Sequence, residues 1–191
     1  MEIEQVIKLK NPLNLDLDEI MCSFVKGSLD NNITFKTLSS YFTGPAKYET
    51  LDRIAFSSAR KWSAIELDSI GTIIVGAPEI IRPDYQLSPR IIEMQKSGAR
   101  VLLIGHHPTL NILQETLGQT TPIGLIVIKD PIRKDAHEAL KFFSDNDVAV
   151  KVISGDNPAT VSAIASQAGV ANAEKYIDAS TIVTDQQLED A

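Results

Sequence analysis

The chain has 191 residues, of which 43% are hydrophobic and 23% are charged, and its formal net charge is −7 at pH 7. This composition is typical of a globular protein with one large or two small domains. The acidic balance argues against a general nucleic-acid binder, which usually presents a basic patch. The single cysteine, Cys22, excludes an intrachain disulfide and a cysteine-based metal cluster.

The N-terminal part of the sequence predicts one strand and two helices. Residues 6–9 alternate as a strand does. Asp16 or Asp18 can cap a helix that closes near residues 30–32, and Gly44 follows a second helix. Apolar side chains recur at helical spacing in both helices: Leu17, Ile20, Met21, Phe24 and Val25 in the first, and Phe35, Leu38, Tyr41 and Phe42 in the second.

Strands dominate the next part of the sequence. We expect them at 54–57, 62–67, 72–75 and 100–104, with the second and third forming an antiparallel hairpin. A helix led by Pro89 precedes the last of these strands. We expect Trp62 to serve in sheet packing.

No element is assigned to residues 105–121. His106 and His107 lie in this segment, and we expect them to be surface or loop residues. Adjacent histidines in extended backbone point to opposite sides and no third ligand is evident, so a metal site is not predicted here.

From residue 123 onward the pattern alternates between strand and helix. Strands are expected at 123–128 and 148–153, each followed by a helix, which is typical of a parallel α/β unit. The sequence therefore predicts an α/β fold in two parts. An antiparallel sheet with covering helices occupies residues 1–121, and a partial parallel α/β domain occupies residues 122–191.

The turn 154–158, with the sequence Ser-Gly-Asp-Asn-Pro, joins the second of these strands to the last helix. Pro158 fits the first position of that helix, where no backbone donor is needed. A strand that delivers Ser154 and Gly155 to a helix N-terminus presents free backbone N–H groups to an anion. From the residues alone, this turn is either an anion-binding site or an ordinary, well-capped turn.

Five motifs, in their order and spacing, resemble the successive signatures of P-type cation-transporting ATPases. They are Phe56-Ser57-Ser58-Ala59-Arg60-Lys61, Gly76-Ala77-Pro78-Glu79, Gly98-Ala99-Arg100-Val101-Leu102, Asp130-Pro131-Ile132-Arg133 and Ser154-Gly155-Asp156-Asn157-Pro158. The resemblance is strongest to the bacterial class that includes calcium-transporting class E pumps. It implies that residues 1–121 are a nucleotide-binding (N) domain with a leading linker strand. Residues 122–191 would then be part of a phosphorylation (P) domain with a haloacid-dehalogenase-like fold.

The resemblance also implies which residues bind ATP. The implied set is Phe56, Arg60, Lys61, Gly76, Ala77 and Arg100. Phe56 is similar to the family aromatic that stacks on adenine, and Arg100 to the arginine that bridges phosphate and ribose. Small residues at 76 and 77 would let the backbone approach the nucleotide.

Two further groups of residues match family motifs in the second half of the chain. Asp130 and Arg133 match the hinge between the N and P domains. Ser154, Gly155 and Asp156 match the motif that holds the transferred phosphoryl group.

Two departures from the family pattern limit the expected activity. Val75 stands where the family usually has lysine, so we expect ATP to bind weakly. The sequence contains neither the phosphorylated Asp-Lys-Thr-Gly-Thr motif nor the Mg²⁺-binding Gly-Asp-Gly-x-Asn-Asp motif. We therefore expect this chain to have no metal site of its own and not to hydrolyse ATP.

The resemblance and the lack of a membrane-length apolar run lead to one expectation about context. We expect the chain to be a cytoplasmic piece of an integral membrane pump of the bacterial plasma membrane, with ATP and Mg²⁺ as cofactors of the whole pump. Its partners would be ATP and the transmembrane and actuator domains, and not nucleic acid.

Two alternatives remain open from the sequence. Asp16-Leu17-Asp18 has the letters of the nucleophile motif of a soluble haloacid-dehalogenase-like phosphatase, although it precedes a helix. Val75 is also compatible with a noncatalytic domain whose nucleotide site has degenerated.

Overall fold

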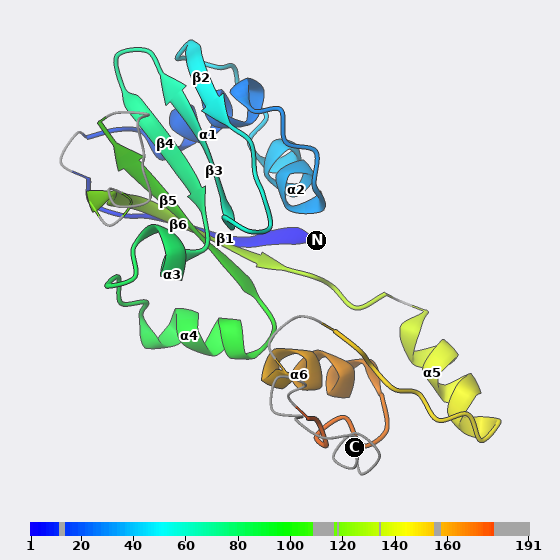
Figure 1. The fold of residues 1–191 in the computed structure, drawn as a ribbon. Coiled ribbons are helices and arrows are strands. Elements are labelled where there is room, and N and C mark those ends of the chain that lie inside the picture. Colours follow the sequence, from blue (N-terminus) through cyan, green and yellow to red (C-terminus); the bar gives the residue numbers. More distant parts are fainter. Residues whose placement is uncertain (12–13, 109–116, 118, 134, 155–157, 178–191) are drawn as a thin grey trace. The chain divides into compact units, whose positions relative to one another are not determined.

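The computed structural model describes residues 1–11, 14–108, 117, 119–133, 135–154 and 158–177 (Figure 1). The chain folds into two compact units. The first contains Met1–Ile91 and Arg100–Lys129, and the second contains Ile92–Ala99 and the described residues from Asp130 onward.

The first unit is built on a six-stranded antiparallel sheet, which Figure 1 shows from one face. The strand order is β1-β6-β5-β4-β3-β2, so β1 and β2 form the edges. The strands are β1 (Glu2–Lys8), β2 (Thr50–Ile54), β3 (Trp62–Leu67), β4 (Gly71–Gly76), β5 (Arg100–His107) and β6 (Thr121–Lys129). The predicted hairpin is confirmed, because β3 and β4 pair directly through the turn at residues 68–70.

Helices α1 (Leu17–Gly27) and α2 (Ile33–Tyr41) pack on one face of this sheet. Asp16 caps α1 by accepting hydrogen bonds from the backbone N–H groups of Asp18 and Glu19, and Asn32 caps α2. The main core is formed between these helices and the sheet, by Leu17, Ile20, Met21, Cys22, Phe24, Val25, Leu38, Phe42, Ile65, Leu67, Ile73, Val75, Ile104, Ile123, Ile126 and Ile128.

The other face of the sheet is also covered. Ile74 and Leu103 alternate with core residues along β4 and β5, and both are fully buried. Helix α3 (Pro78–Ile81) packs against these two strands and buries Ile81. Helix α4 (Pro89–Lys96) follows it and contributes the buried Ile91 from its first turn.

Strand β6 corrects the predicted boundary between the two parts of the chain. The predicted strand at 123–128 forms, but it pairs antiparallel with β1 and β5 and does not open a parallel α/β unit. The first unit therefore extends to Lys129 and not to residue 121. A run of buried apolar residues fits a central antiparallel strand and a parallel strand equally well, and only the pairing partners decide between them.

The prediction for the two adjacent histidines was wrong. His106 and His107 are the last residues of β5, and their side chains are only 8% and 5% exposed. The Nε2 atom of His106 lies 2.7 Å from the carbonyl oxygen of Ile70, which is a hydrogen bond within the fold.

The second unit contains helices α5 (Ala136–Asp145) and α6 (Pro158–Ala168). The predicted helix start at Pro158 is confirmed, and Gly169, which follows the helix, has a φ of 94°. The predicted strand at 148–153 is wrong for this structure, because these residues form no strand and Ile153 is 97% exposed. The described residues between 130 and 177 contain no strand, so they show no parallel sheet.

No helix in the described part of the chain has the length and apolar character needed to cross a membrane.

Candidate functional site

The strand pairing brings distant parts of the chain to one end of the sheet. In register, Ile54 of β2 faces Ala64 of β3, Trp62 of β3 faces Gly76 of β4, and Gly76 faces Leu103 of β5. The end of β2, the start of β3, the end of β4 and the start of β5 therefore share one end of the sheet, called here the β2–β5 end.

Four of the predicted nucleotide-binding residues lie at the β2–β5 end. Phe56 follows β2, Lys61 directly precedes β3, Gly76 ends β4, and Arg100 begins β5. Neighbouring strands are about 4.8 Å apart, so the three steps from β2 to β5 span about 14 Å. The fold thus places an aromatic residue and two cationic residues at one end of the sheet, with Arg100 three residues before Leu103, the partner of Gly76.

Phe56 is held in a short loop between β2 and β3. Phe56 is 40% exposed, so its ring is accessible to a ligand. The backbone N–H of Phe56 donates a 2.8 Å hydrogen bond to Oδ1 of Asp30, which follows α1. Sequence reasoning missed Asp30, because it marked only the end of a helix there.

The same loop closes on itself before β3 begins. The backbone N–H of Lys61 donates to the carbonyl oxygen of Ser57 at 2.8 Å, and that of Arg60 donates to the Ser57 hydroxyl at 3.1 Å. Lys61 has a φ of 61°, in the left-handed region that favours glycine. Its side chain is exposed.

Arg60 makes its contacts within the loop. Nη2 donates a 2.6 Å hydrogen bond to the carbonyl oxygen of Ala55, and Cζ lies 5.6 Å from the centroid of the Trp62 ring. The Nε atom is buried and has no hydrogen-bond partner among the described residues. Trp62 is 4% exposed, which confirms its role in packing.

Gly76 and Ala77 lie where β4 meets this loop. A Cβ atom on Gly76 would lie 2.4 Å from the carbonyl oxygen of Lys61 and 2.5 Å from Cβ of Trp62, so a side chain does not fit. Ala77 donates its backbone N–H to the same Lys61 oxygen at 3.0 Å. The need for glycine at position 76 therefore comes from strand packing, whether or not a nucleotide approaches.

Val75, which replaces the usual family lysine, is 4% exposed and belongs to the core under α1 and α2. The side chain at this position is thus an integral part of the packing. Position 75 therefore supplies no positive charge at the β2–β5 end.

The other predicted site residues belong to the second unit. Asp130 directly follows β6 and is exposed, as is Arg133, whose carbonyl oxygen accepts a hydrogen bond from the backbone N–H of Ala136. Ser154 is exposed and lies four residues before α6 begins. Gly155 and Asp156 lie outside the described residues.

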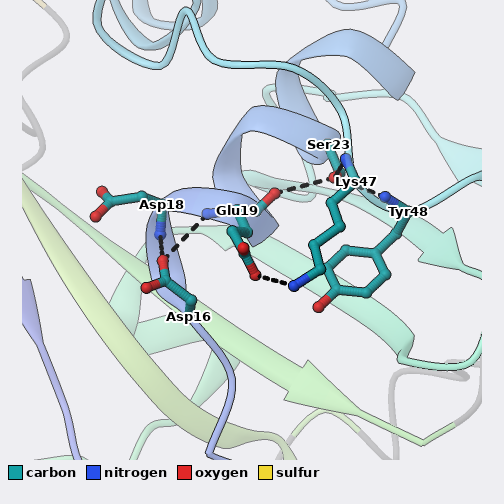
Figure 2. A network of polar contacts seen from close by, with 6 residues as sticks. All are labelled: Asp16, Asp18, Glu19, Ser23, Lys47 and Tyr48. Atoms are coloured by element: carbon teal, nitrogen blue, oxygen red, sulfur yellow. Dashed lines mark hydrogen bonds and ion pairs between the residues drawn. The ribbon is translucent and has the colours of Figure 1, made fainter.

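A polar network fixes the segment that leads into β2 (Figure 2). The Ser23 hydroxyl of α1 accepts hydrogen bonds from the backbone N–H groups of Lys47 and Tyr48, at 3.0 and 3.2 Å. The Lys47 ammonium pairs with the Glu19 carboxylate at 2.6 Å and lies 5.6 Å from the centroid of the Tyr48 ring. The hydrogen bond from Lys47 to Glu19 raises the pKa of Lys47.

Asp16 belongs to the same network through the start of α1 (Figure 2). The backbone N–H groups of Glu19 and Asp18 donate to its carboxylate, and they lower the pKa of Asp16. The network therefore attaches the chain before β2 to a buried helix that carries its own charged cap.

The described residues contain no group of three or more histidine, cysteine, aspartate or glutamate side chains that could hold a metal ion.

Comparison with known proteins places this fold in a family. No family model matches the chain. It is 36% identical over 197 residues to the probable cation-transporting ATPase exp7 of Streptococcus pneumoniae, a match that covers 98% of this chain and 24% of that protein. It is 29% identical over 153 residues to the calcium-transporting ATPase CtpE of Mycobacterium bovis, covering 80% of this chain and 19% of that protein.

A solved structure shares the fold. The zinc-transporting PIB-type ATPase in its E2.Pi state matches with a TM-score of 0.59 and 16% sequence identity, over 88% of this chain and 25% of that one.

The chain shares its antiparallel sheet and covering helices with this solved P-type ATPase. Its fold is therefore that of a P-type ATPase domain. The chain belongs to the family of P-type cation-transporting ATPases, and its relatives include bacterial members. It spans about a quarter or less of the length of the two curated relatives described above.

Proposed function

We propose that the first compact unit binds ATP at the β2–β5 end of its sheet. The observation that carries this proposal is that the strand pairing places the loop with Phe56 and Lys61 at the same end of the sheet as Arg100, which follows 39 residues later in the sequence. The half-exposed Phe56 ring stacks on the adenine base, and the two cationic residues interact with ribose and phosphates.

The pump to which this activity contributes is proposed from the relatives. Proteins named as cation- and calcium-transporting ATPases match 98% and 80% of this chain. The unit then supplies ATP to a phosphorylation site, where an aspartyl-phosphate forms and drives cation movement across a membrane. The remaining domains of the pump, including its transmembrane and actuator domains, are the partners, and the unit described here faces the cytoplasm.

The chain by itself binds nucleotide weakly and does not hydrolyse it. Val75 removes a cation from the site, and a lost charge-assisted contact costs about 1–3 kcal/mol, or tenfold or more in affinity. Mg²⁺ supplies charge neutralisation during phosphoryl transfer, and the described residues contain no group of three or more metal-ligating side chains. Ser154, at the approach to α6, is the proposed phosphoryl contact, and Asp130 with Arg133 is the proposed hinge.

The alternative of a soluble phosphatase is disfavoured by the contacts of its candidate nucleophile. The Asp16 carboxylate accepts hydrogen bonds from two backbone N–H groups at the start of α1, and Asp18 forms an ion pair with Lys8. A carboxylate that caps a helix is poorly placed to attack a phosphate ester.

Equilibrium titration of the chain with ATP tests the proposal. Phe56→Ala removes the stacking surface, which is worth about 1–3 kcal/mol where bases stack on aromatic side chains, so the affinity falls about fivefold or more. Phe142→Ala is the matched control, because this ring is also exposed but lies on α5 in the second unit. Equal ATP affinities for Phe56→Ala and the unmodified chain would contradict the proposed site.

A further inference from the structure

One peptide group in the β2–β3 loop is bound at both ends by side chains of opposite charge. The carbonyl oxygen of Ala55 accepts the 2.6 Å hydrogen bond from Arg60, and the N–H of Phe56 donates the 2.8 Å hydrogen bond to Asp30. These two groups belong to the same planar unit and point in opposite directions. A cation at the oxygen and an anion at the N–H therefore both match the polarity of the peptide, and charge-assisted bonds are the stronger kind.

We propose that Asp30 and Arg60 are positioning residues that hold the Ala55–Phe56 peptide and thereby place the Phe56 ring for stacking on an adenine base. This inference rests on the proposed function of the β2–β5 end and gives Arg60 a different role from that of a direct nucleotide ligand. The two side chains and the peptide between them are called here the peptide clamp.

The contacts of Arg60 favour this role. One nitrogen is committed to Ala55, the guanidinium carbon lies over the ring of the buried Trp62, and Nε is itself buried. A guanidinium held in this way keeps a fixed orientation, because its planar group is fixed by both a hydrogen bond and an aromatic ring. The exposed Lys61 next to it is the better candidate for contact with phosphates.

Asp30 connects the clamp to the core. Its backbone N–H donates to the Ser28 hydroxyl at 3.1 Å, and Ser28 in turn donates its backbone N–H to the carbonyl oxygen of Phe24 at 3.0 Å. Phe24 is 1% exposed in α1. The loop that carries Phe56 is therefore attached to the end of α1, a helix with a buried face. This attachment restricts the conformations of the loop before a ligand binds, so less conformational entropy is lost when the base stacks on the ring.

The clamp makes a distinctive energetic prediction. A residue that positions Phe56 affects binding of the base, so its loss weakens adenosine, ADP and ATP by the same factor. A residue that contacts phosphates affects ATP more than adenosine. The number of phosphates on the ligand thus separates the two roles of Arg60.

The experiment measures the affinities of the whole chain for adenosine, ADP and ATP by chemical-shift titration. Arg60→Ala and Asp30→Ala each weaken all three ligands by an equal factor of about tenfold, the size expected for one charge-assisted hydrogen bond. The double variant is little weaker than either single one, because both act on one peptide group. Asp30→Asn keeps an acceptor oxygen and retains most of the affinity.

Matched controls and a ligand-free readout complete the test. Lys141→Ala and Asp145→Ala remove exposed charges of α5, in the second unit, and leave the affinities unchanged. Without nucleotide, the Phe56 amide exchanges faster with solvent in both clamp variants than in the controls, since its hydrogen bond or the alignment of its peptide is lost.

The outcomes distinguish this inference from the proposed function. If Arg60→Ala weakens ATP but not adenosine, or if both clamp variants bind normally while Phe56→Ala does not, the clamp is rejected and the nucleotide site stands. If the unmodified chain binds none of the three ligands, the proposed function fails and the clamp's role in it fails as well.

Discussion

The carbonyl oxygen of Lys61 accepts a hydrogen bond from the backbone N–H of Ala77 at 3.0 Å, and so joins the Phe56 loop to the end of β4. The approach is possible because residue 76 has no side chain; a Cβ there would lie 2.4 Å from the same oxygen. The loop and the start of α3 are thus placed relative to each other by backbone contacts.

Gly76→Ala therefore perturbs both stability and the nucleotide site. Overpacking against backbone that cannot move lowers the free energy of unfolding by about 1–3 kcal/mol, and ATP affinity falls with it. Urea denaturation and ATP titration measure the two effects. Gly124→Ala is the comparison, because its Cβ would meet side-chain carbons of Leu17 and Ile104 and not a backbone atom. If Gly76→Ala and the unmodified chain have equal free energies of unfolding, the close approach of the Lys61 carbonyl oxygen to residue 76 does not require glycine.

Lys61→Gly separates the backbone role of this residue from its charge. Glycine adopts the φ of 61° without strain, so we expect the free energy of unfolding to stay within about 1 kcal/mol. Loss of the ammonium weakens ATP by about tenfold while adenosine is unaffected. Ser69, in the β3–β4 turn, has the same φ of 61° as Lys61. Ser69→Gly is therefore the control for the effect of glycine on the backbone. An equal loss of adenosine and ATP affinity would contradict a phosphate contact for Lys61.

Asp16 gives the fold a defined pH dependence. The backbone N–H groups of Glu19 and Asp18 lower the pKa of its carboxyl group, so the native state favours the ionised form. The stability from this effect is fully present above the ordinary carboxyl pKa of about 3.9 and is lost as the pH falls through the lower native value. Asp16→Asn keeps a good N-cap but does not titrate.

Urea denaturation at several pH values measures this effect. The stability difference between the unmodified chain and Asp16→Asn stays constant near neutral pH and shrinks as the pH falls below about 3.9. Asp16→Ala loses the cap and costs about 1 kcal/mol at neutral pH. A stability difference between the unmodified chain and Asp16→Asn that does not change with pH would show that the cap interaction does not depend on ionisation.

The chain incubated with ATP and Mg²⁺ is expected to release no phosphate above the buffer background. The sequence has no Asp-Lys-Thr-Gly-Thr motif to supply the nucleophile, and the described residues hold no metal-ligand cluster. A colorimetric phosphate assay over hours provides the measurement. Steady release that Phe56→Ala abolishes would mean that the chain carries a complete catalytic site.

Features that depend on neighbouring residues in sequence could be predicted. The Asp16 cap of α1, the β3–β4 hairpin and the start of α6 at Pro158 all form as expected. Each depends on a local signal: a capping carboxylate, a two-strand alternation with a turn, or a proline that fits the first helical position. The resemblance to P-type ATPases also correctly indicated the family.

Features that depend on distant partners could not be predicted. The apolar run in β6 gave no information on its antiparallel neighbours, and the similar run at 148–153 forms no strand where no partner strand is described. The hydrogen bond from the backbone N–H of Phe56 to the Asp30 carboxylate joins residues 26 positions apart. Neither residue type predicts this contact from the sequence. The candidate site was therefore predictable as a set of motifs, but the contacts that hold it were not.

Mapping of backbone amide shifts during an ATP titration tests the central claim most directly. We predict that saturable shifts appear at Phe56, Lys61, Gly76 and Arg100, which come from three segments of the chain that share the β2–β5 end. Residues at the opposite end of the sheet, such as Ser69 and His106, should not respond. Shifts confined to that opposite end or to α5 and α6, or no saturable shifts at all, would contradict a nucleotide site at the β2–β5 end.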